Sequence, residues 1–600
     1  MRILARLNGF FWKYKRLFIP GLLAAVAASG FAIVVPMVVR MSVDSIPRFV
    51  TLYKSYQGTP IADALYAEFF LSLLFFGAVI IALSLMSGVF SFLMRQTVVV
   101  ASRHIEYDLR NQLYDHLQNL SHDFYLRHAT GDLITHATSD IEQIRRYVGP
   151  AIMYTTRAVV IIITAMTAMF IISPQLTWYV LIPMPLLTVA VFFVAHMVHS
   201  RSDALQKQYS VLTSRVQEAL AGIRVLKAYV REEMEAKAFE DESRVYRDRS
   251  LDLARAEAAW RPLFLILVGS ASVIVVWIGG QLVMEGAVTI GNIAEYIIYV
   301  ALMTWPVAAM GFVITMVQRA AASMERLSKI LDADPSIVDG DETDTKIEKI
   351  TGAIRFEKVT YRYDEDGVAV LKNIDFDVRA GTTLAIVGRT GSGKTTLVEM
   401  IPRLLDPSEG TILIDGHDVK TIPVDVLRRS IGYVPQEVFL FSDTIANNIA
   451  FGNMDAGSEA IETAAKEADL LENIHEFPEE FETFVGERGV TLSGGQKQRV
   501  SISRALIRNP NILILDDALS AVDVNTERTI LQHLRQHFGK RTIVIVSHRI
   551  SAVQDADHIL VLDDGEVAEA GTHDILLSMN GIYASLHRKQ LLEAELEAIV

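Results

Sequence analysis

The chain has 600 residues, of which 51% are hydrophobic, and its mean hydropathy is +0.30. It is too long for one domain and too apolar for an ordinary soluble protein. Its formal net charge of −14 argues against a nucleic-acid partner, because such proteins carry clustered basic surfaces, and the absence of cysteine excludes disulfides and thiolate metal sites.

Charge is distributed unevenly along the chain. Long stretches before residue 320 lack any Asp, Glu, Lys or Arg, whereas the sequence from about residue 330 is that of an ordinary soluble protein. We therefore expect a membrane domain over 1–325, a linker over 326–350 and a soluble domain over 351–600. The basic start of the chain leads into an apolar run too long for the core of a cleavable signal, so we expect it to be retained.

Six apolar windows are long enough to cross a bilayer, which takes about 20 residues of helix. Because every backbone polar group must be satisfied within the segment, these windows are predicted to be helices. Spans three and four are joined by three residues and spans five and six by a short turn, so each pair is expected to form a tight hairpin. The windows are 17–39, 68–92, 151–172, 176–198, 261–284 and 292–317.

The orientation follows from where the basic residues lie. Neither hairpin turn contains Lys or Arg, whereas the N-terminus and the segments 93–150 and 199–259 carry many. The positive-inside bias makes that side cytoplasmic, so we expect a multi-pass protein of the cell membrane with its N-terminus and soluble domain inside the cell. Helical spacing in the two long segments predicts that the spans continue as helices beyond the bilayer, where they would carry force to the soluble domain.

A phosphate-binding loop is predicted in the soluble domain. The strand-like run 383–387 leads into a glycine-rich loop and then an apolar-periodic helix, the context that such a loop requires. Its backbone N–H groups would hold the phosphates, Lys394 would reach the β- and γ-phosphates, and the Thr395 hydroxyl would bind Mg²⁺. The residues assigned to the loop are Gly388, Arg389, Thr390, Gly391, Ser392, Gly393, Lys394, Thr395 and Thr396.

Two further strands end in polar residues. The run 512–515 ends in Asp516 and Asp517, and the run 542–546 ends in Ser547 and His548. Ligands bind at the carboxyl edge of parallel strands, so we expect these groups to lie there together, with Asp516 as the Mg²⁺ partner. A lone histidine at this position is more often structural, but its place beside the other strand ends favours a functional role.

Between these strands lies Leu492 followed by Ser493, Gly494, Gly495 and Gln496, at the start of a predicted helix. This run, the phosphate loop and the aspartate strand together resemble the ABC transporter signature set. The resemblance covers essentially the whole chain and is closest to the exporter branch. It implies an α-helical membrane domain of six transmembrane helices plus an α/β P-loop nucleotide-binding domain in one polypeptide.

The resemblance also implies roles for single residues and a dimer. Tyr363 corresponds to the aromatic that stacks on adenine, Gln436 to the glutamine that senses Mg²⁺ and water, and His548 to the γ-phosphate switch. Residues 520–523 correspond to the loop that crosses the dimer, and Glu487 to the segment that contacts the membrane domain. The cofactors are then ATP and Mg²⁺, and each ATP lies between one chain's phosphate loop and the other chain's Ser493–Gln496 run.

Asp517 departs from the family pattern, because hydrolysing members carry Glu directly after the Mg²⁺ aspartate as the base that polarises water. A general base must lie within about 2.6 to 3.2 Å of the proton it accepts, and Asp is one methylene shorter than Glu. We therefore expect this chain's own site to bind ATP but hydrolyse it poorly, with hydrolysis mainly at the composite site of a non-identical partner that has Glu. The alternative is a homodimer that tolerates Asp517.

Several residues within the spans are candidates for substrate binding. Arg157 in span three would face a substrate cavity or a lipid phosphate, or else snorkel, and Glu295 near the outer end of span six is expected to be wetted. Span six also contains Tyr296, Tyr299, Met303, Trp305 and Met310, which suit varied apolar ligands or simply face lipid and neighbouring helices.

The function expected from the sequence is ATP-dependent export of a small amphipathic or lipid-like compound, with membrane lipids as further partners. A homodimeric lipid flippase is the alternative within the family, and an ATP-gated channel or regulatory subunit is the alternative outside it. No selectivity-filter pattern or ring of charges favours the channel.

Overall fold

The computed structural model describes residues 2–364, 367–535 and 540–599, which form two compact units. The first contains Met1–Gln118 and Thr130–Ala333, and the second contains Asn119–Ala129 and Asp334–Val600. The short segment Asn119–Ala129 thus belongs to the second unit, although the residues before and after it belong to the first. We expected the linker to begin at residue 326, whereas the last long helix of the first unit continues to Leu331.

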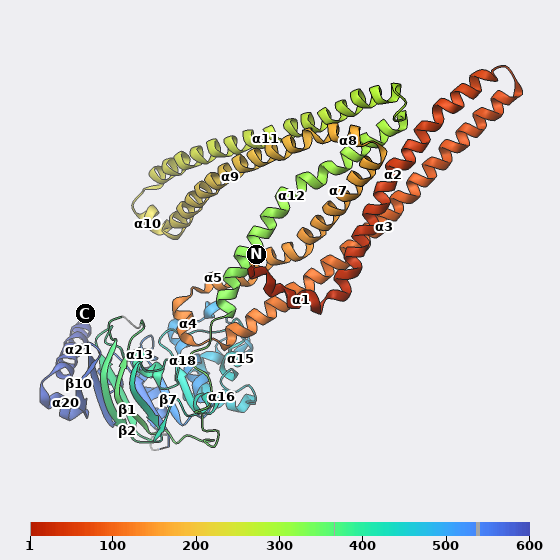
Figure 1. The fold of residues 1–600 in the computed structure, drawn as a ribbon. Coiled ribbons are helices and arrows are strands. Elements are labelled where there is room, and N and C mark those ends of the chain that lie inside the picture. The colour runs from red at the N-terminus through yellow and green to blue at the C-terminus, as the bar shows by residue number, and fades with distance from the viewer. Residues whose placement is uncertain (1, 365–366, 536–539, 600) are drawn as a thin grey trace. The chain divides into compact units, whose positions relative to one another are not determined.

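The first unit is entirely helical in its described part, and Figure 1 shows its long helices. At 1.5 Å per residue, the 60-residue helix α3 is about 90 Å long, three times the hydrocarbon thickness of a bilayer. α9 and α11 pack along each other, with the short helix α10 between them. The elements are η1 (Arg2–Leu7), α1 (Asn8–Lys13), α2 (Lys15–Ser55), α3 (Pro60–Asn119), α5 (Thr130–Thr135), η2 (His136–Asp140), α6 (Ile141–Arg146), η3 (Tyr147–Ala151), α7 (Ile152–Ile172), α8 (Pro174–Leu181), α9 (Pro183–Ala221), α10 (Ile223–Ala228), α11 (Glu232–Met284) and α12 (Ile290–Leu331).

Four helical runs of the described residues are long and apolar enough to cross a membrane, namely Lys15–Ser55, Pro60–Asn119, Thr130–Ile172 and Ile290–Leu331. They contain the expected spans one, two, three and six. The expected span five corresponds to α11, whose stretch Val268–Met284 is a shorter apolar helix. The expected span four falls on α8 and the start of α9, which are separated at Ile182 just before Pro183.

The run Thr130–Ile172 is not a uniform α-helix, because η2 and η3 are π-helical turns. Asp140 lies at the end of the first turn and is buried. Its carboxylate accepts hydrogen bonds from the Arg326 side chain of α12 (Nε 3.0 Å), from Ser323 Oγ (2.8 Å) and from His136 Nδ1 (2.6 Å). Burial alone would raise the pKa of Asp140, but these three hydrogen bonds lower it below its usual value. The π turn therefore fastens this run to α12.

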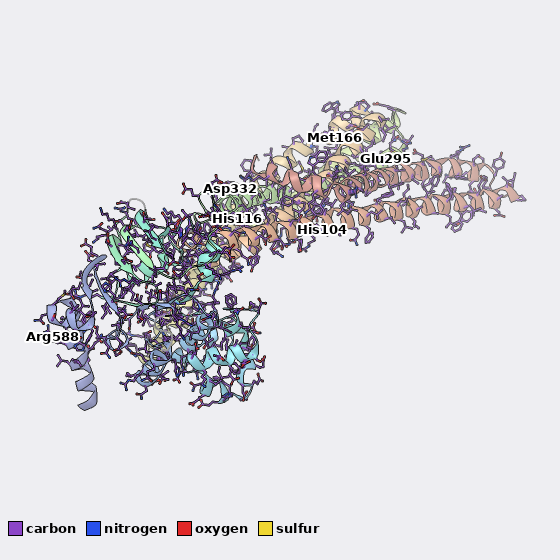
Figure 2. The ribbon with its side chains drawn as sticks, turned by 90° about the horizontal axis from the view of Figure 1, so that it is seen from below. His104, His116, Met166, Glu295, Asp332 and Arg588 are labelled. Carbon is purple, nitrogen blue, oxygen red and sulfur yellow. The ribbon has the colours of Figure 1, made fainter. Side chains whose placement is uncertain are left out.

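The expectation that Glu295 is wetted is wrong. Its side chain is fully buried, and its carboxylate pairs with Arg40 of α2 (3.3 Å) and accepts a hydrogen bond from Tyr299 (3.0 Å). One turn further along α2, Asp44 accepts from the Gly291 backbone N–H (2.8 Å) at the start of α12. Figure 2 shows Glu295 among the long helices, toward the end away from His116 and Asp332. A charge from another helix allows Glu295 to be buried.

The second unit is an α/β domain built on two sheets. One has the order β2-β1-β4-β5, and the other has the order β10-β9-β3-β8-β7-β6, in which β9, β3, β8, β7 and β6 run parallel. β3, β7 and β8 are continuous apolar runs because both faces of the sheet are covered. The strands are β1 (Ile354–Tyr361), β2 (Leu371–Val378), β3 (Thr383–Gly388), β4 (Glu409–Ile414), β5 (His417–Asp418), β6 (Ile431–Val434), β7 (Ile512–Asp516), β8 (Thr542–Val546), β9 (His558–Asp563) and β10 (Glu566–Gly571).

Two apolar cores hold this unit together, one between the two sheets and one between the parallel sheet and the helices on its other side. A third apolar cluster lies among the helices that follow β6. The helices are α4 (His122–Arg127), α13 (Lys394–Met400), α14 (Val424–Arg429), α15 (Ile445–Ala450), α16 (Ser458–Glu467), α17 (Leu471–His475), η4 (Glu480–Glu482), η5 (Glu487–Gly489), α18 (Gly494–Leu506), α19 (Val524–Arg535), η6 (Ile550–Ala552), α20 (His573–Met579) and α21 (Ile582–Ile599).

Candidate nucleotide-binding site

The glycine-rich loop after β3 adopts a conformation that requires glycine at two positions. Gly391 and Gly393 have φ angles of +84° and +94°, where a side chain is strained. A Cβ added to Gly393 would also come within 2.7 Å of the Leu371 side chain. Directly after Gly393 the chain enters α13, so the loop wraps around the first turn of this helix.

Lys394 folds back over this loop. Its Nζ donates to the carbonyl oxygens of Gly388 (3.0 Å) and Arg389 (2.8 Å). Burial lowers the pKa of Lys394, and the nearby Asp517 and Asp516 oppose that effect. A buried ammonium group held only by backbone carbonyls is well suited to exchange them for phosphate oxygens, which are stronger acceptors.

Asp516 ends β7, which lies between β8 and the edge strand β6, and is nearly completely buried. Among the described residues, neither of its carboxylate oxygens completes a hydrogen bond, and the same holds for the buried Ser392 hydroxyl of the loop. Burial raises the pKa of Asp516 to about 6, with the charge of Asp517 adding to the effect, while the nearby Thr395 hydroxyl lowers it. A buried acceptor without a donor is what a cation would satisfy.

Asp516 and Thr395 fit Mg²⁺ better than a metal ion whose ligands all come from protein side chains. In the described part of the chain, no group of three or more His, Cys, Asp or Glu side chains is placed to hold a metal. Mg²⁺ is commonly bound by one or two protein oxygens together with phosphate oxygens and water. Asp516 and Thr395 supply such oxygens beside the loop.

The structure brings most of the predicted site residues into one cavity of about 210 Å³. Parallel neighbours β3, β8 and β7 place their carboxyl ends at one edge, as expected for a doubly wound sheet. Val370 lies in the cavity wall although no sequence signal singled it out. The lining residues are Val370, Thr390, Gly391, Gly393, Lys394, Thr395, Thr396, Gln436, Asp516, Asp517, Val546 and His548.

Tyr363 lies at one side of this site. Its hydroxyl shares a hydrogen bond with that of Thr396 (3.0 Å), and its ring meets that of Tyr361 edge to face. Its backbone carbonyl accepts a hydrogen bond from Arg127 of α4 (3.1 Å). Because α4 belongs to the segment that directly follows α3, this segment contacts the backbone of the residue predicted to stack on adenine. Sequence reasoning did not single out Arg127.

The Ser493–Gln496 run does not line the cavity. Ser493 caps α18, and its hydroxyl accepts from the Gln496 N–H (3.3 Å) while the Gln496 side chain accepts from the Ser493 N–H (2.9 Å). Ser493 and Gly494 are exposed, and the next three residues of α18 are half-buried. The single chain thus contains two separate polar surfaces, the cavity and this helix start.

Glu487 is exposed in η5, between Gly486 and Gly489, whose φ angles are both positive. Beside it, Phe484 and Val490 are large apolar side chains left in solvent. In the first unit, the segment around α10 exposes Val225, Tyr229 and Val230. Each unit therefore exposes apolar side chains, and those beside Glu487 lie in the segment for which the resemblance implies a contact.

The aromatic residues proposed for substrate binding in α12 divide into two groups. Tyr296, Tyr299 and Met303 are buried among helices, and the Tyr296 hydroxyl donates to the Met169 carbonyl (2.6 Å). Trp305 and Met310 are exposed. A separate cavity of about 480 Å³ lies at the start of α7, lined by residues of η1, α1, η3, α7 and α12; Arg157 is half-buried and is not among its lining residues.

Two family models match this chain. Residues 17–307 match the model described as ABC transporter transmembrane region, and residues 371–520 match the model described as ABC transporter. A chain titled "Structure of a bacterial Atm1-family ABC exporter with ATP bound" has the same fold, with a TM-score of 0.75 and 26% identity over 96% of this chain and 98% of that one.

Curated relatives match over most of their length. The probable multidrug resistance ABC transporter ATP-binding/permease protein YheI of Bacillus subtilis is 37% identical, covering 87% of this chain and 89% of the relative. The multidrug resistance-like ATP-binding protein MdlA of Escherichia coli is 34% identical, covering 100% and 98%. An ATP-dependent lipid A-core flippase of Chromohalobacter salexigens is 35% identical, covering 85% and 87%.

The expected fold class, a helical transmembrane domain followed by an α/β nucleotide-binding domain, is confirmed by these matches. The chain belongs to the ABC transporter family, as an exporter half-transporter that couples ATP hydrolysis to transport through fused membrane and ATP-binding domains.

Proposed function

We propose that this chain is one subunit of a heterodimeric ABC exporter whose own nucleotide site binds ATP with Mg²⁺ but hydrolyses it slowly. The observation that carries the proposal is Asp517 in the cavity wall, at the position where hydrolysing members of the family have Glu. The missing methylene withdraws the carboxylate by about 1.5 Å, which exceeds the distance tolerance of a general base.

The backbone of Asp517 is held on both sides, which argues against a shift that would restore the reach of its carboxylate. Its N–H donates to the Val546 carbonyl (2.9 Å), and its carbonyl accepts from the Ser520 hydroxyl (2.8 Å). Its φ of +47° is a conformation that few non-glycine residues adopt. A shift of 1.5 Å would break both hydrogen bonds.

The partner is proposed to be a second exporter half with Glu at the matching position. The Ser493–Gln496 run of this chain has its full complement of residues and lies outside the cavity, so it is available to complete a site on that partner. The apolar side chains exposed around α10 and around η5 suit an assembly in which another chain covers them. Hydrolysis would then occur mainly at the partner's composite site.

Within this chain's site, Tyr363 is proposed to stack on adenine and the loop from Gly388 to Thr396 to hold the phosphates. Thr395, Gln436 and Asp516 would hold Mg²⁺, which neutralises phosphate charge when bound. Asp517 would orient water weakly and His548 would contact the γ-phosphate. The cavity that these groups line, and the unsatisfied oxygens of Asp516, support these roles.

The cargo is proposed to be an amphipathic or lipid-like compound, moved outward across the cell membrane. The relatives' names support this class, since they include multidrug resistance proteins and a lipid A-core flippase. The N-terminus and the nucleotide-binding domain would lie in the cytoplasm, as the positive-inside bias of the sequence suggests.

The proposal is tested by measuring ATP turnover of the purified chain alone in lipid, beside Asp517→Glu. Asp455→Glu, in an exposed turn outside the cavity, is the matched control because it lengthens a carboxylate without approaching the site. We expect negligible turnover in the parent and the control, and clear turnover in Asp517→Glu. Substantial turnover by the parent, lost on Lys394→Ala, would overturn the heterodimer and leave a homodimeric exporter or flippase that tolerates aspartate.

A further inference from the structure

Arg549 follows His548 and has no part in the nucleotide site described above. Arg549 is not among the residues that line the cavity, and its guanidinium group contacts the segment 520–522. Nη1 donates to Glu527 (2.7 Å) and to the Val522 carbonyl (3.1 Å), and Nη2 donates to the Ser520 carbonyl (3.1 Å). One side chain thus joins the loop after β8 to the loop after β7.

Glu527, the charged partner of Arg549, is buried at the start of α19, with 3% of its side chain exposed. Its other carboxylate oxygen accepts from the Ser551 hydroxyl (2.9 Å). Glu527 therefore accepts hydrogen bonds from both Arg549 and Ser551. A buried carboxylate needs such partners to offset the cost of removing it from water. This pairing anchors the loop after β8 to α19.

Two glutamines hold the backbone on either side of this contact. Gln590 of α21 donates to the His548 carbonyl (2.5 Å) and accepts from the Ile550 N–H (2.8 Å). On the opposite side, Gln498 of α18 accepts from the Ala521 N–H (2.9 Å) and donates to the Ser520 hydroxyl (3.1 Å). Each loop is therefore held by a glutamine, and the guanidinium of Arg549 joins the two loops.

We propose that Arg549 is a positioning residue that couples the location of His548 to the segment 520–523. This inference rests on the proposed function, which assigns the γ-phosphate contact to His548, and on the dimer contact that the sequence resemblance implies for that segment. When His548 is drawn toward a bound phosphate, Arg549 carries the segment with it. A shift of the segment against a second chain likewise displaces His548.

The geometry of the three hydrogen bonds explains why arginine is needed. A lysine can keep the ion pair with Glu527, but its compact ammonium group cannot also reach two carbonyls in different directions. Arg549→Lys therefore separates the coupling from the charge balance of the buried carboxylate. Arg549→Ala would leave Glu527 uncompensated and is less informative, because the domain can fail to fold.

The test uses the full chain in lipid. Because the chain contains no cysteine, an introduced cysteine is labelled specifically. A single Asn525→Cys, exposed at the start of α19, carries a nitroxide label whose mobility is recorded with and without MgATP. Arg528→Lys, an exposed arginine on the same helix, is the matched control. We expect ATP to change the label mobility in the parent and the control, and the change to be lost in Arg549→Lys at unaltered nucleotide affinity, with a cooperative thermal melt showing that the variant is folded.

Turnover is measured in the Asp517→Glu background. There we expect Arg549→Lys to lower kcat by about tenfold to a hundredfold, with KM changed less than about twofold, because only positioning is lost. A label response retained in Arg549→Lys, or no response in the parent, would overturn the coupling. Failure of Asp517→Glu to gain turnover would count against the proposed function alone, since the label experiment does not depend on hydrolysis.

Discussion

The pair formed by Arg40 and Glu295 predicts an asymmetric effect of removing either partner. Glu295 has no exposed side-chain surface, whereas 35% of the Arg40 side chain is exposed. Arg40→Met leaves a buried carboxylate with only the hydroxyl of Tyr299 and the amide of Asn292 beside it. Glu295→Gln leaves an arginine that is only partly buried, so its unpaired charge costs less than a fully buried one.

The magnitudes follow from this difference in burial. Removing one partner of a buried ion pair costs about 3 to 5 kcal/mol, because the other charge is left uncompensated. We expect Arg40→Met to cost about 3 kcal/mol and Glu295→Gln about 1 kcal/mol, the latter being the loss of an ordinary hydrogen bond. The double variant Arg40→Met/Glu295→Gln should be more stable than Arg40→Met alone, since it no longer contains the buried charge.

The assay is thermal unfolding of the full chain in lipid nanodiscs, followed by intrinsic tryptophan fluorescence at one scan rate. For a unit of this size, about 3 kcal/mol corresponds to a fall in melting temperature on the order of 5 °C. Arg48→Met is the matched control, because Arg48 is exposed on the same helix. The reasoning would be refuted if Arg40→Met were as stable as Glu295→Gln. It would also be refuted if the stability lost by the double variant equalled the sum of the losses of the two single variants.

Three further predictions concern other contacts. The pKa of Asp140 is lower in the folded chain than its unfolded value of about 3.9, so ionised Asp140 stabilises the folded chain above that pH, and this contribution is lost as the pH falls through the folded pKa. We therefore expect Asp140→Asn to melt at a lower temperature than the parent near neutral pH. Below about pH 4 the melting temperature of Asp140→Asn should change less with pH than that of the parent. Gly393→Ala should weaken binding of a fluorescent ATP analogue by about tenfold or more, whereas Gly391→Ala, equally strained but with no atom within 4 Å of its Cβ, should weaken it less; equal losses would exclude the clash with Leu371 as the cause. The guanidinium group of Arg504 donates to the Phe439 carbonyl and to the backbone and side chain of Asn448. Arg504→Lys should therefore lower the free energy of unfolding by about 2 kcal/mol, measured by thermal melting. An unchanged melting temperature would show that the hydrogen bonds of the planar guanidinium group contribute nothing to stability.

Much of the candidate site could be predicted from local sequence. A strand that is buried on both faces must be a continuous apolar run, and the residue that follows it lies at the sheet edge. That is why Lys394, Asp516, Asp517 and His548, which are spread over more than 150 residues, could be assigned to one place and are found in one cavity. The apolar windows that predicted membrane helices are equally local, because hydrophobic length alone decides whether a helix can cross lipid.

Contacts between distant segments could not be predicted in this way. Nothing in the neighbourhood of Glu295 indicates that Arg40, 255 residues earlier, accompanies it into the interior. Arg127 and Val370 line or approach the nucleotide site only because the chain folds back there, and their own neighbours in the sequence do not distinguish them from other residues. Gln590 likewise reaches the loop of His548 from a helix 42 residues further along the chain.

The sequence by itself determined the class of the protein, its membrane-spanning windows and the chemistry of its phosphate site, because these depend on hydrophobic length, strand periodicity and residues adjacent in the chain. Only the tertiary structure decided which charges are buried and which loops are joined by side chains. Burial and coupling depend on side chains supplied by other elements, as Glu527 is paired by Arg549 and Asp140 by Arg326. Such pairings leave no periodic pattern in the sequence. Each one compensates a single buried charge with a residue from a distant part of the chain.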